Sequence, residues 1–212
     1  MFRFKGVIFD LDGTLADSMG IWAQIDIDFL SKRNIELPSD YMHKIAHLGS
    51  YQTALYTIER FNLTDSPEEL ISEWVEMAKK AYEEIPLKPG ADFFLDYLSK
   101  NNIKIAIASA TELSLIERFL KTKGIYEKID TIVTLSEVNR GKEFPDIYLK
   151  CCEKLNIEPA DCMVCEDLLA AVRGAKSGGF YVVGIYDSYS KKDTKHIKEC
   201  CDKFIYDFRE LL

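Results

Sequence analysis

Two aspartates two positions apart follow directly after the first apolar run of the chain. The run is Val7-Ile8-Phe9, and the acidic segment is Asp10-Leu11-Asp12-Gly13-Thr14-Leu15. A carboxylate can attack phosphorus to form an acyl phosphate, and a second one can protonate the leaving oxygen and then activate water. Gly13 allows the backbone to turn tightly beside a ligand. Taken alone, the segment is more typical of an Asx-turn, in which both side chains only cap backbone groups.

Polar side chains also follow three later apolar runs. Ser109-Ala110-Thr111 comes after the second run, Lys142 after the third, and Glu166-Asp167 after the fourth. Each has an ordinary explanation by itself, as a helix cap, a surface lysine and the acidic start of a helix. Ligands of open α/β sheets bind at the carboxyl ends of strands, so we expect all four segments to meet at one site. Four acids together require a dication, and Mg²⁺ suits carboxylate and phosphate oxygens.

The apolar runs and the helical patterns between them predict the elements that position this site. We expect strands at 7–9, 103–108, 131–135, 162–165, 181–186 and 204–206, separated by helices, which is typical of a parallel sheet covered on both faces. Between about 18 and 82 the spacing is helical throughout, and Ser66-Pro67-Glu68-Glu69 is a capping box that opens the last of some four helices. Four helices are too many for a simple crossover. We therefore predict an α/β core at 1–16 and 86–212 and an inserted helical domain at 17–85.

Composition excludes several classes of partner. The 212 residues carry a net charge of -8, which disfavours nucleic acid as a partner. No apolar stretch approaches the roughly 20 residues of a membrane span, and the first residues lack the layout of a cleavable signal. Six cysteines in a chain of this length indicate buried thiols rather than disulfides. We expect a reduced cytoplasmic protein, with a monomer favoured.

Together the four segments resemble the motifs of the haloacid dehalogenase superfamily, and the helical insertion resembles its α-helical cap. Within the superfamily the layout is similar to the group of β-phosphoglucomutase and phosphoglycolate phosphatase. The resemblance implies an α/β fold with a Rossmann-like parallel sheet. It also implies Asp10 as a nucleophile that forms an aspartyl phosphate, Asp12 as general acid/base, and Ser109 and Lys142 as phosphate ligands.

The same resemblance implies a magnesium site. Its ligands would be the Asp10 carboxylate, the Asp12 backbone carbonyl and Asp167, with Glu166 orienting the waters of the metal. Asp12 also favours phosphate esters as substrates, because the dehalogenases and phosphonate hydrolases of the superfamily lack a carboxylate at that position.

The alternative within the superfamily is a sugar phosphomutase of the β-phosphoglucomutase type. That enzyme uses a cap His, and a Lys and an Arg around a cap Gly. Here the matching positions are Trp22, and Leu48 and Gln52 flanking Gly49, so a second phosphate on the substrate has no obvious partner. We therefore expect a magnesium-dependent phosphatase that acts on a small phosphorylated metabolite.

Four further residues are candidates for substrate contact. Trp22, His47 and Tyr51 come from the expected cap, and Ala110 follows Ser109. For the aromatic residues, ordinary packing within the cap is the alternative. An alternative of another class is a non-catalytic phospho-acceptor or binding protein, since receiver domains also combine an Asp, a hydroxyl, a Lys and magnesium. They place the phosphorylated Asp after the third strand, whereas the acidic pair here follows the first.

Overall fold

Every apolar run expected as a strand belongs to one six-stranded sheet in this computed structural model, which describes residues 3–212. All neighbouring strands are parallel, in the order β3-β2-β1-β4-β5-β6. The predicted α/β fold is confirmed, and the strand ends differ from those expected by at most one residue. The strands are β1 (Gly6–Phe9), β2 (Lys104–Ser109), β3 (Thr131–Thr134), β4 (Cys162–Glu166), β5 (Tyr181–Ile185) and β6 (Lys203–Ile205).

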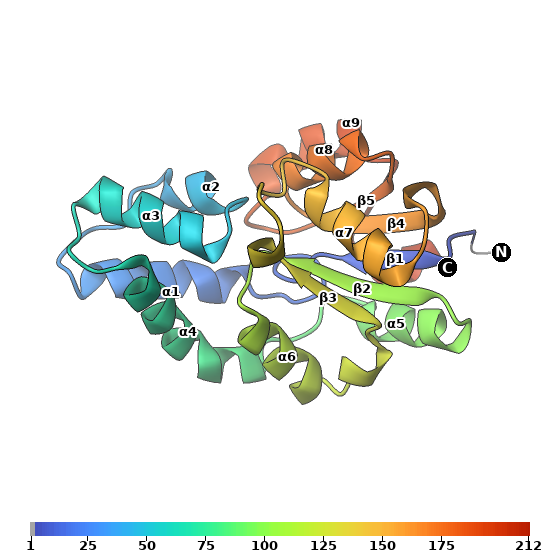
Figure 1. Ribbon diagram of the computed structural model, residues 1–212, viewed down its shortest axis with the longest axis horizontal. Coiled ribbons are helices and arrows are strands. Elements are labelled where there is room, and N and C mark those ends of the chain that lie inside the picture. Colours follow the sequence, from blue (N-terminus) through green and yellow to red (C-terminus); the bar gives the residue numbers. More distant parts are fainter. Residues whose placement is uncertain (1–2) are drawn as a thin grey trace.

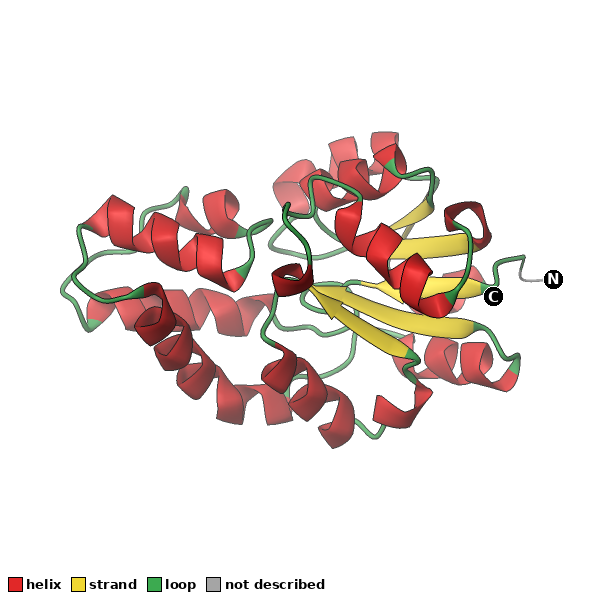
Figure 2. Cartoon of the chain, in the orientation of Figure 1, coloured by secondary structure: helices red, strands yellow, loops and turns green. Residues whose placement is uncertain are grey.

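Helices cover both faces of the sheet, which explains the near-continuous hydrophobicity of its strands. On β1, Val7 and Phe9 belong to one buried cluster and Ile8 to the other, because successive side chains point to opposite faces. One face packs against α5 (Ala91–Lys100) and α6 (Leu113–Thr122). The other packs against α7 (Asp146–Leu155), α8 (Leu169–Ser177) and α9 (Thr194–Cys200), as Figures 1 and 2 show.

Four helices lie between β1 and α5, at one end of the molecule and beyond the edge of the sheet (Figure 1). They are α1 (Met19–Ser31), α2 (Tyr41–Ile45), α3 (Ser50–Phe61) and α4 (Pro67–Glu84). The predicted capping box opens α4, since the Ser66 backbone N–H donates to the Glu69 carboxylate at 2.7 Å and the Glu69 N–H donates to Ser66 Oγ at 3.3 Å. The arrangement is that of an inserted helical unit, and its bounds at 17–85 stay a prediction.

The two segments that connect these helices to the sheet lie side by side. Asp17 N–H donates to the Pro86 carbonyl at 3.0 Å, and Lys88 N–H donates to the Leu15 carbonyl at 2.9 Å. The Lys88 ammonium is buried and donates to Asp187 at 2.7 Å. Insertion and sheet are thus joined through one compact double connection. Within residues 3–212, no helix combines the length and the apolar character needed to cross a membrane.

Candidate active site

Side chains from separate strand ends meet at the carboxyl edge of the sheet. Asp10 follows β1, Ser109 ends β2 and Glu166 ends β4, while Lys142 lies between β3 and α7. The Lys142 ammonium donates to Asp10 Oδ1 and, at 2.7 Å, to Glu166 Oε1. All four residues are at most 5% exposed. The structure therefore brings the predicted residues together, and their individual roles stay predictions.

Burial and like charge dominate the electrostatics of this cluster. Burial raises the pKa of Asp10 to about 7, with contributions from Glu166 and Asp12, while Lys142 opposes the shift. Burial also raises the pKa of Asp167 well above its usual range, and the neighbouring carboxylates of Asp10 and Glu166 add to it. The pKa of Lys142 is raised as well: burial opposes its charge, but Asp10 and Glu166 outweigh burial. The site holds more buried carboxyl groups than one lysine could neutralise if all were ionised.

The acids form a group suited to a hard cation. Asp10, Glu166 and Asp167 each offer an oxygen within 4.8 Å of the others. Asp167 Oδ1 accepts from Thr14 Oγ1 at 3.1 Å, whereas Asp167 Oδ2 is buried and has no hydrogen-bond partner among residues 3–212. An orphaned carboxylate oxygen in this place is costly, and an all-oxygen donor set fits Mg²⁺. These residues therefore fit the metal that the sequence predicts.

Glu166 is held by neighbouring protein groups. Its Oε1 accepts from Lys142 and, at 2.8 Å, from Tyr148, and its Oε2 accepts from the Asp167 backbone N–H at 3.2 Å. Asp10 and Asp167 therefore keep more oxygen capacity for a ligand than Glu166 does. This agrees with the expectation that Glu166 acts beside the cation rather than on it, which stays a prediction.

Two glycines allow the close approaches on which this geometry depends. Gly13 has a φ of +86°, and a Cβ there would lie 2.6 Å from Asp167 Oδ2. Gly174 of α8 lies against the Lys142 loop, where a Cβ would lie 2.0 Å from the Lys142 carbonyl oxygen. A side chain at either position would displace a residue of the site.

Asp12 is held by donors from both the core and the insertion. Its Oδ1 accepts from Ser18 Oγ at 2.6 Å, from Trp22 Nε1 at 3.1 Å and from the Tyr82 hydroxyl. Its Oδ2 accepts from Thr111 Oγ1 at 2.6 Å. Because Trp22 lies on α1 and Tyr82 on α4, the orientation of this acid is tied to the helices of the insertion.

A cavity of about 160 Å³ extends from these acids into the insertion. Of the four expected substrate contacts, Trp22 and Ala110 line it, together with Leu48. His47 and Tyr51 are not among the lining residues, and Tyr51 is 48% exposed. Instead, the His47 carbonyl accepts from the Lys142 backbone N–H at 3.5 Å, so His47 contacts the Lys142 loop through its main chain. Side-chain contact of His47 or Tyr51 with substrate stays a prediction without geometric support.

Several residues of the site were not predicted as such. The sequence pattern indicates Tyr82 only as one apolar position of a helix and Thr111 only as a helix cap. In the structure both residues donate to Asp12. Tyr148, which donates to Glu166, carries no sequence signal. Asp26 is a buried acid that lines the cavity, and its spacing of four from Trp22 on one helix is the signal that could have found it.

Residues 7–185 match the family model described as haloacid dehalogenase-like hydrolase. The β-phosphoglucomutase of Bacillus subtilis is 30% identical over 193 residues, which cover 85% of this chain and 83% of that protein.

A second relative is the bifunctional riboflavin kinase/FMN phosphatase of Arabidopsis thaliana, 29% identical over 180 residues. The match covers 84% of this chain, which spans about half (48%) of that longer protein. Among solved structures, a β-phosphoglucomutase from Clostridium difficile superimposes with a TM-score of 0.82 at 22% identity, covering 99% of this chain and 93% of that one. That likeness is one of fold.

Proposed function

This chain belongs to the haloacid dehalogenase-like hydrolase family, and its phosphatase-named relatives support a phosphoric monoester hydrolase. From that premise we propose that it is a magnesium-dependent phosphatase of small phosphate monoesters. The observation that carries the proposal is the contact of Lys142 with Asp10 beside the orphaned oxygen of Asp167. It brings together an attacking carboxylate, a fixed cation and an unsatisfied oxygen for a metal. Names of relatives support a small phosphorylated substrate, since one is an FMN phosphatase and another a phosphomutase of glucose phosphate.

In the proposed reaction a carboxylate oxygen of Asp10 forms a bond to phosphorus while the bond from phosphorus to the leaving oxygen breaks. Asp12 gives its proton to that oxygen, and the aspartyl phosphate remains on Asp10. Water then attacks phosphorus and Asp12 takes a proton from it, while the bond from phosphorus to the Asp10 oxygen breaks, so that phosphate leaves and the Asp10 carboxylate is restored. Lys142 and Ser109 hold oxygens of the transferring group. Mg²⁺, held by Asp10, Asp167 and the Asp12 carbonyl, would supply further charge neutralisation.

The lining of the cavity favours hydrolysis over the phosphomutase alternative. Within residues 3–212, Lys142 is the one basic side chain that lines it. Trp22 and Leu48, which stand at positions where the sugar phosphomutase carries cationic groups, give the cavity an indole and an aliphatic wall. A bisphosphate intermediate needs a second cluster of donors for its other phosphate, and this cavity offers none comparable.

The test is turnover of p-nitrophenyl phosphate with Mg²⁺, with EDTA, and in the Asp10→Asn variant. The proposal predicts turnover that requires Mg²⁺ and falls by at least about 1000-fold in Asp10→Asn, because an amide oxygen is a poor nucleophile. Asp17→Asn is the matched control: Asp17 is seven positions later and its side chain is 58% exposed, so this variant should keep wild-type turnover. Hydrolysis that survives in Asp10→Asn, or that ignores EDTA, would overturn the proposal.

A further inference from the structure

One buried acid in the cavity has no role in the proposed chemistry. Asp26 of α1 is 8% exposed, lines the cavity, and has no hydrogen-bond or ion-pair partner within residues 3–212. It follows Trp22 by four positions, so it lies on the same side of α1, about 6 Å farther along the helix axis. Trp22 contacts Asp12, and Asp26 is therefore one helical turn deeper in the insertion than the reacting groups.

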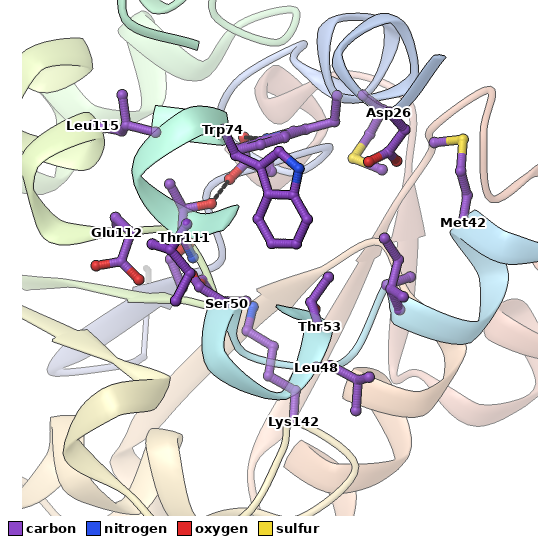
Figure 3. A pocket seen from close by; sticks show the side chains of 18 of the residues that line it. Asp26, Met42, Leu48, Ser50, Thr53, Trp74, Thr111, Glu112, Leu115 and Lys142 are labelled. Carbon is purple, nitrogen blue, oxygen red and sulfur yellow. Dashed lines mark hydrogen bonds between the residues drawn. The ribbon is translucent and has the colours of Figure 1, made fainter. Parts of the chain in front are cut away.

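The insertion lines the cavity mainly with apolar side chains, which include Met19, Met42, Ile45, Ile71, Trp74 and Val75. Tyr41 of α2 also lies near Asp26. In Figure 3 the Asp26 carboxylate and the Trp74 indole both point into this space, from α1 and α4 respectively. The Trp74 indole N–H is itself buried and has no acceptor in the part of the chain that the structure describes. Among residues 3–212 the Asp26 carboxyl group thus opens to the cavity without a protein partner, and the Trp74 indole N–H near it is buried without one, although buried polar groups are normally satisfied.

The charged groups that line the cavity limit which chemical group of a substrate can donate a hydrogen bond to Asp26. Away from Lys142, its charged lining groups are the carboxylates of Asp12, Asp26 and Glu112. A second anionic group on a substrate would be repelled there. A hydroxyl or an ammonium group can donate to Asp26, and an ammonium would also be attracted by the indole face of Trp74.

We propose that Asp26 is a specificity-determining residue that accepts a hydrogen bond from the leaving group of the substrate. The substrate class is a phosphate monoester whose leaving alcohol has a short apolar body and a terminal donor, hydroxyl or amine. This inference rests on the proposed function and extends it from the phosphate to the other end of the substrate. Burial alone accounts for the raised pKa of Asp26, which agrees with a carboxyl group that has no partner until the substrate brings one.

The test compares alkyl phosphates of equal length, about three to six carbons, that end in methyl, hydroxyl, ammonium or carboxylate. The proposal predicts that at about pH 8, where Asp26 is ionised, wild-type kcat/KM for the hydroxyl or the ammonium ester exceeds that for the methyl ester by at least about tenfold, the worth of a hydrogen bond to a charged group. The carboxylate ester should be the poorest. Whichever donor ester ranks first identifies the donor, hydroxyl or ammonium.

The Asp26→Leu variant should reverse this preference. Removing an unpaired charge from an apolar cavity favours the methyl ester, so the ratio of donor ester to methyl ester should fall to about one or below. Asp28→Asn, on the same helix but exposed and bonded to Gln24, is the control and should keep the wild-type ratio. A ratio that is the same in wild type and Asp26→Leu would overturn the inference while the proposed function stands. Failure of the wild type to hydrolyse any of the four esters or p-nitrophenyl phosphate would overturn the proposed function itself.

Discussion

Asp26 gives the most quantitative prediction for the free protein, because its burial has a cost in the free energy of unfolding that depends on pH. The pKa of Asp26 is raised from 3.8 to about 7 by burial. One pKa unit corresponds to about 1.4 kcal/mol, so ionised Asp26 lowers the free energy of unfolding by about 4 kcal/mol at most. Other ionisable groups on the same cavity are Asp10, Asp12, Glu112 and Lys142. Tyr41 of α2 is also close, since burial raises its pKa and Asp26 contributes to that increase.

The sign of the effect follows from proton linkage. Below pH 4 Asp26 is neutral in both the folded and the unfolded chain and costs nothing through its charge. Between pH 4 and 7 the unfolded chain loses the proton while the folded chain keeps it, so the penalty grows, and above pH 7 it is constant. Asp26→Asn removes this titration. The free energy of unfolding of the variant minus that of wild type should therefore rise by up to about 4 kcal/mol from pH 4 to pH 8.

Denaturant unfolding of both proteins at several pH values measures this difference directly, because contributions of the other titrating groups largely cancel between them. Asp28→Asn, exposed on the same helix, should give a difference that is nearly flat with pH. A flat difference for Asp26→Asn as well, or one that falls as pH rises, would refute the assignment of Asp26 as an unpartnered buried acid.

Three further variants test single contacts of the site. Lys142→Met leaves Asp10 and Glu166 without their buried cation, so denaturant unfolding should show a loss of about 3–5 kcal/mol and turnover should fall by about 100-fold or more. Gly13→Ala directs a Cβ at Asp167 Oδ2 and should raise the Mg²⁺ concentration for half-maximal activity at least about tenfold, whereas Gly124→Ala, also at positive φ but with nothing within 4 Å, should leave that concentration unchanged. Thr111→Val removes the donor to Asp12 Oδ2 and should lower kcat about tenfold with little change in KM; an effect on KM alone would contradict a role of Thr111 in holding Asp12.

The sequence allowed the sheet and the meeting of the motifs to be predicted because both depend on short-range patterns. Fully buried parallel strands need continuous apolar runs, and their carboxyl ends share one edge. Asp10, Ser109 and Lys142 could therefore be grouped before any coordinates. The contacts around Asp12 could not, because Tyr82 reaches it from the far end of a helix 70 residues later, and helical periodicity does not distinguish a tyrosine that packs from one that donates.

The insertion was harder to interpret for the same reason. His47 and Tyr51 have residue types suited to substrate, yet the turn of α3 leaves Tyr51 exposed and the Lys142 loop contacts the His47 main chain. Asp26 and Asp28 are two positions apart on α1, and the packing of α1 within the insertion buries Asp26 and exposes Asp28. The rotation of a helix about its own axis decides which of its side chains face the cavity and which face solvent. A single sequence constrains that rotation only weakly.

The most direct measurement is the identification of the phosphorylated residue during turnover. Rapid quenching in acid of the wild-type protein with Mg²⁺ and a labelled phosphate ester, followed by peptide mass spectrometry, should locate the phosphoryl group on Asp10, at the end of β1 beside Lys142. Phosphate found on any other side chain, or steady turnover without a phosphorylated Asp10 in the quenched samples, would contradict the account.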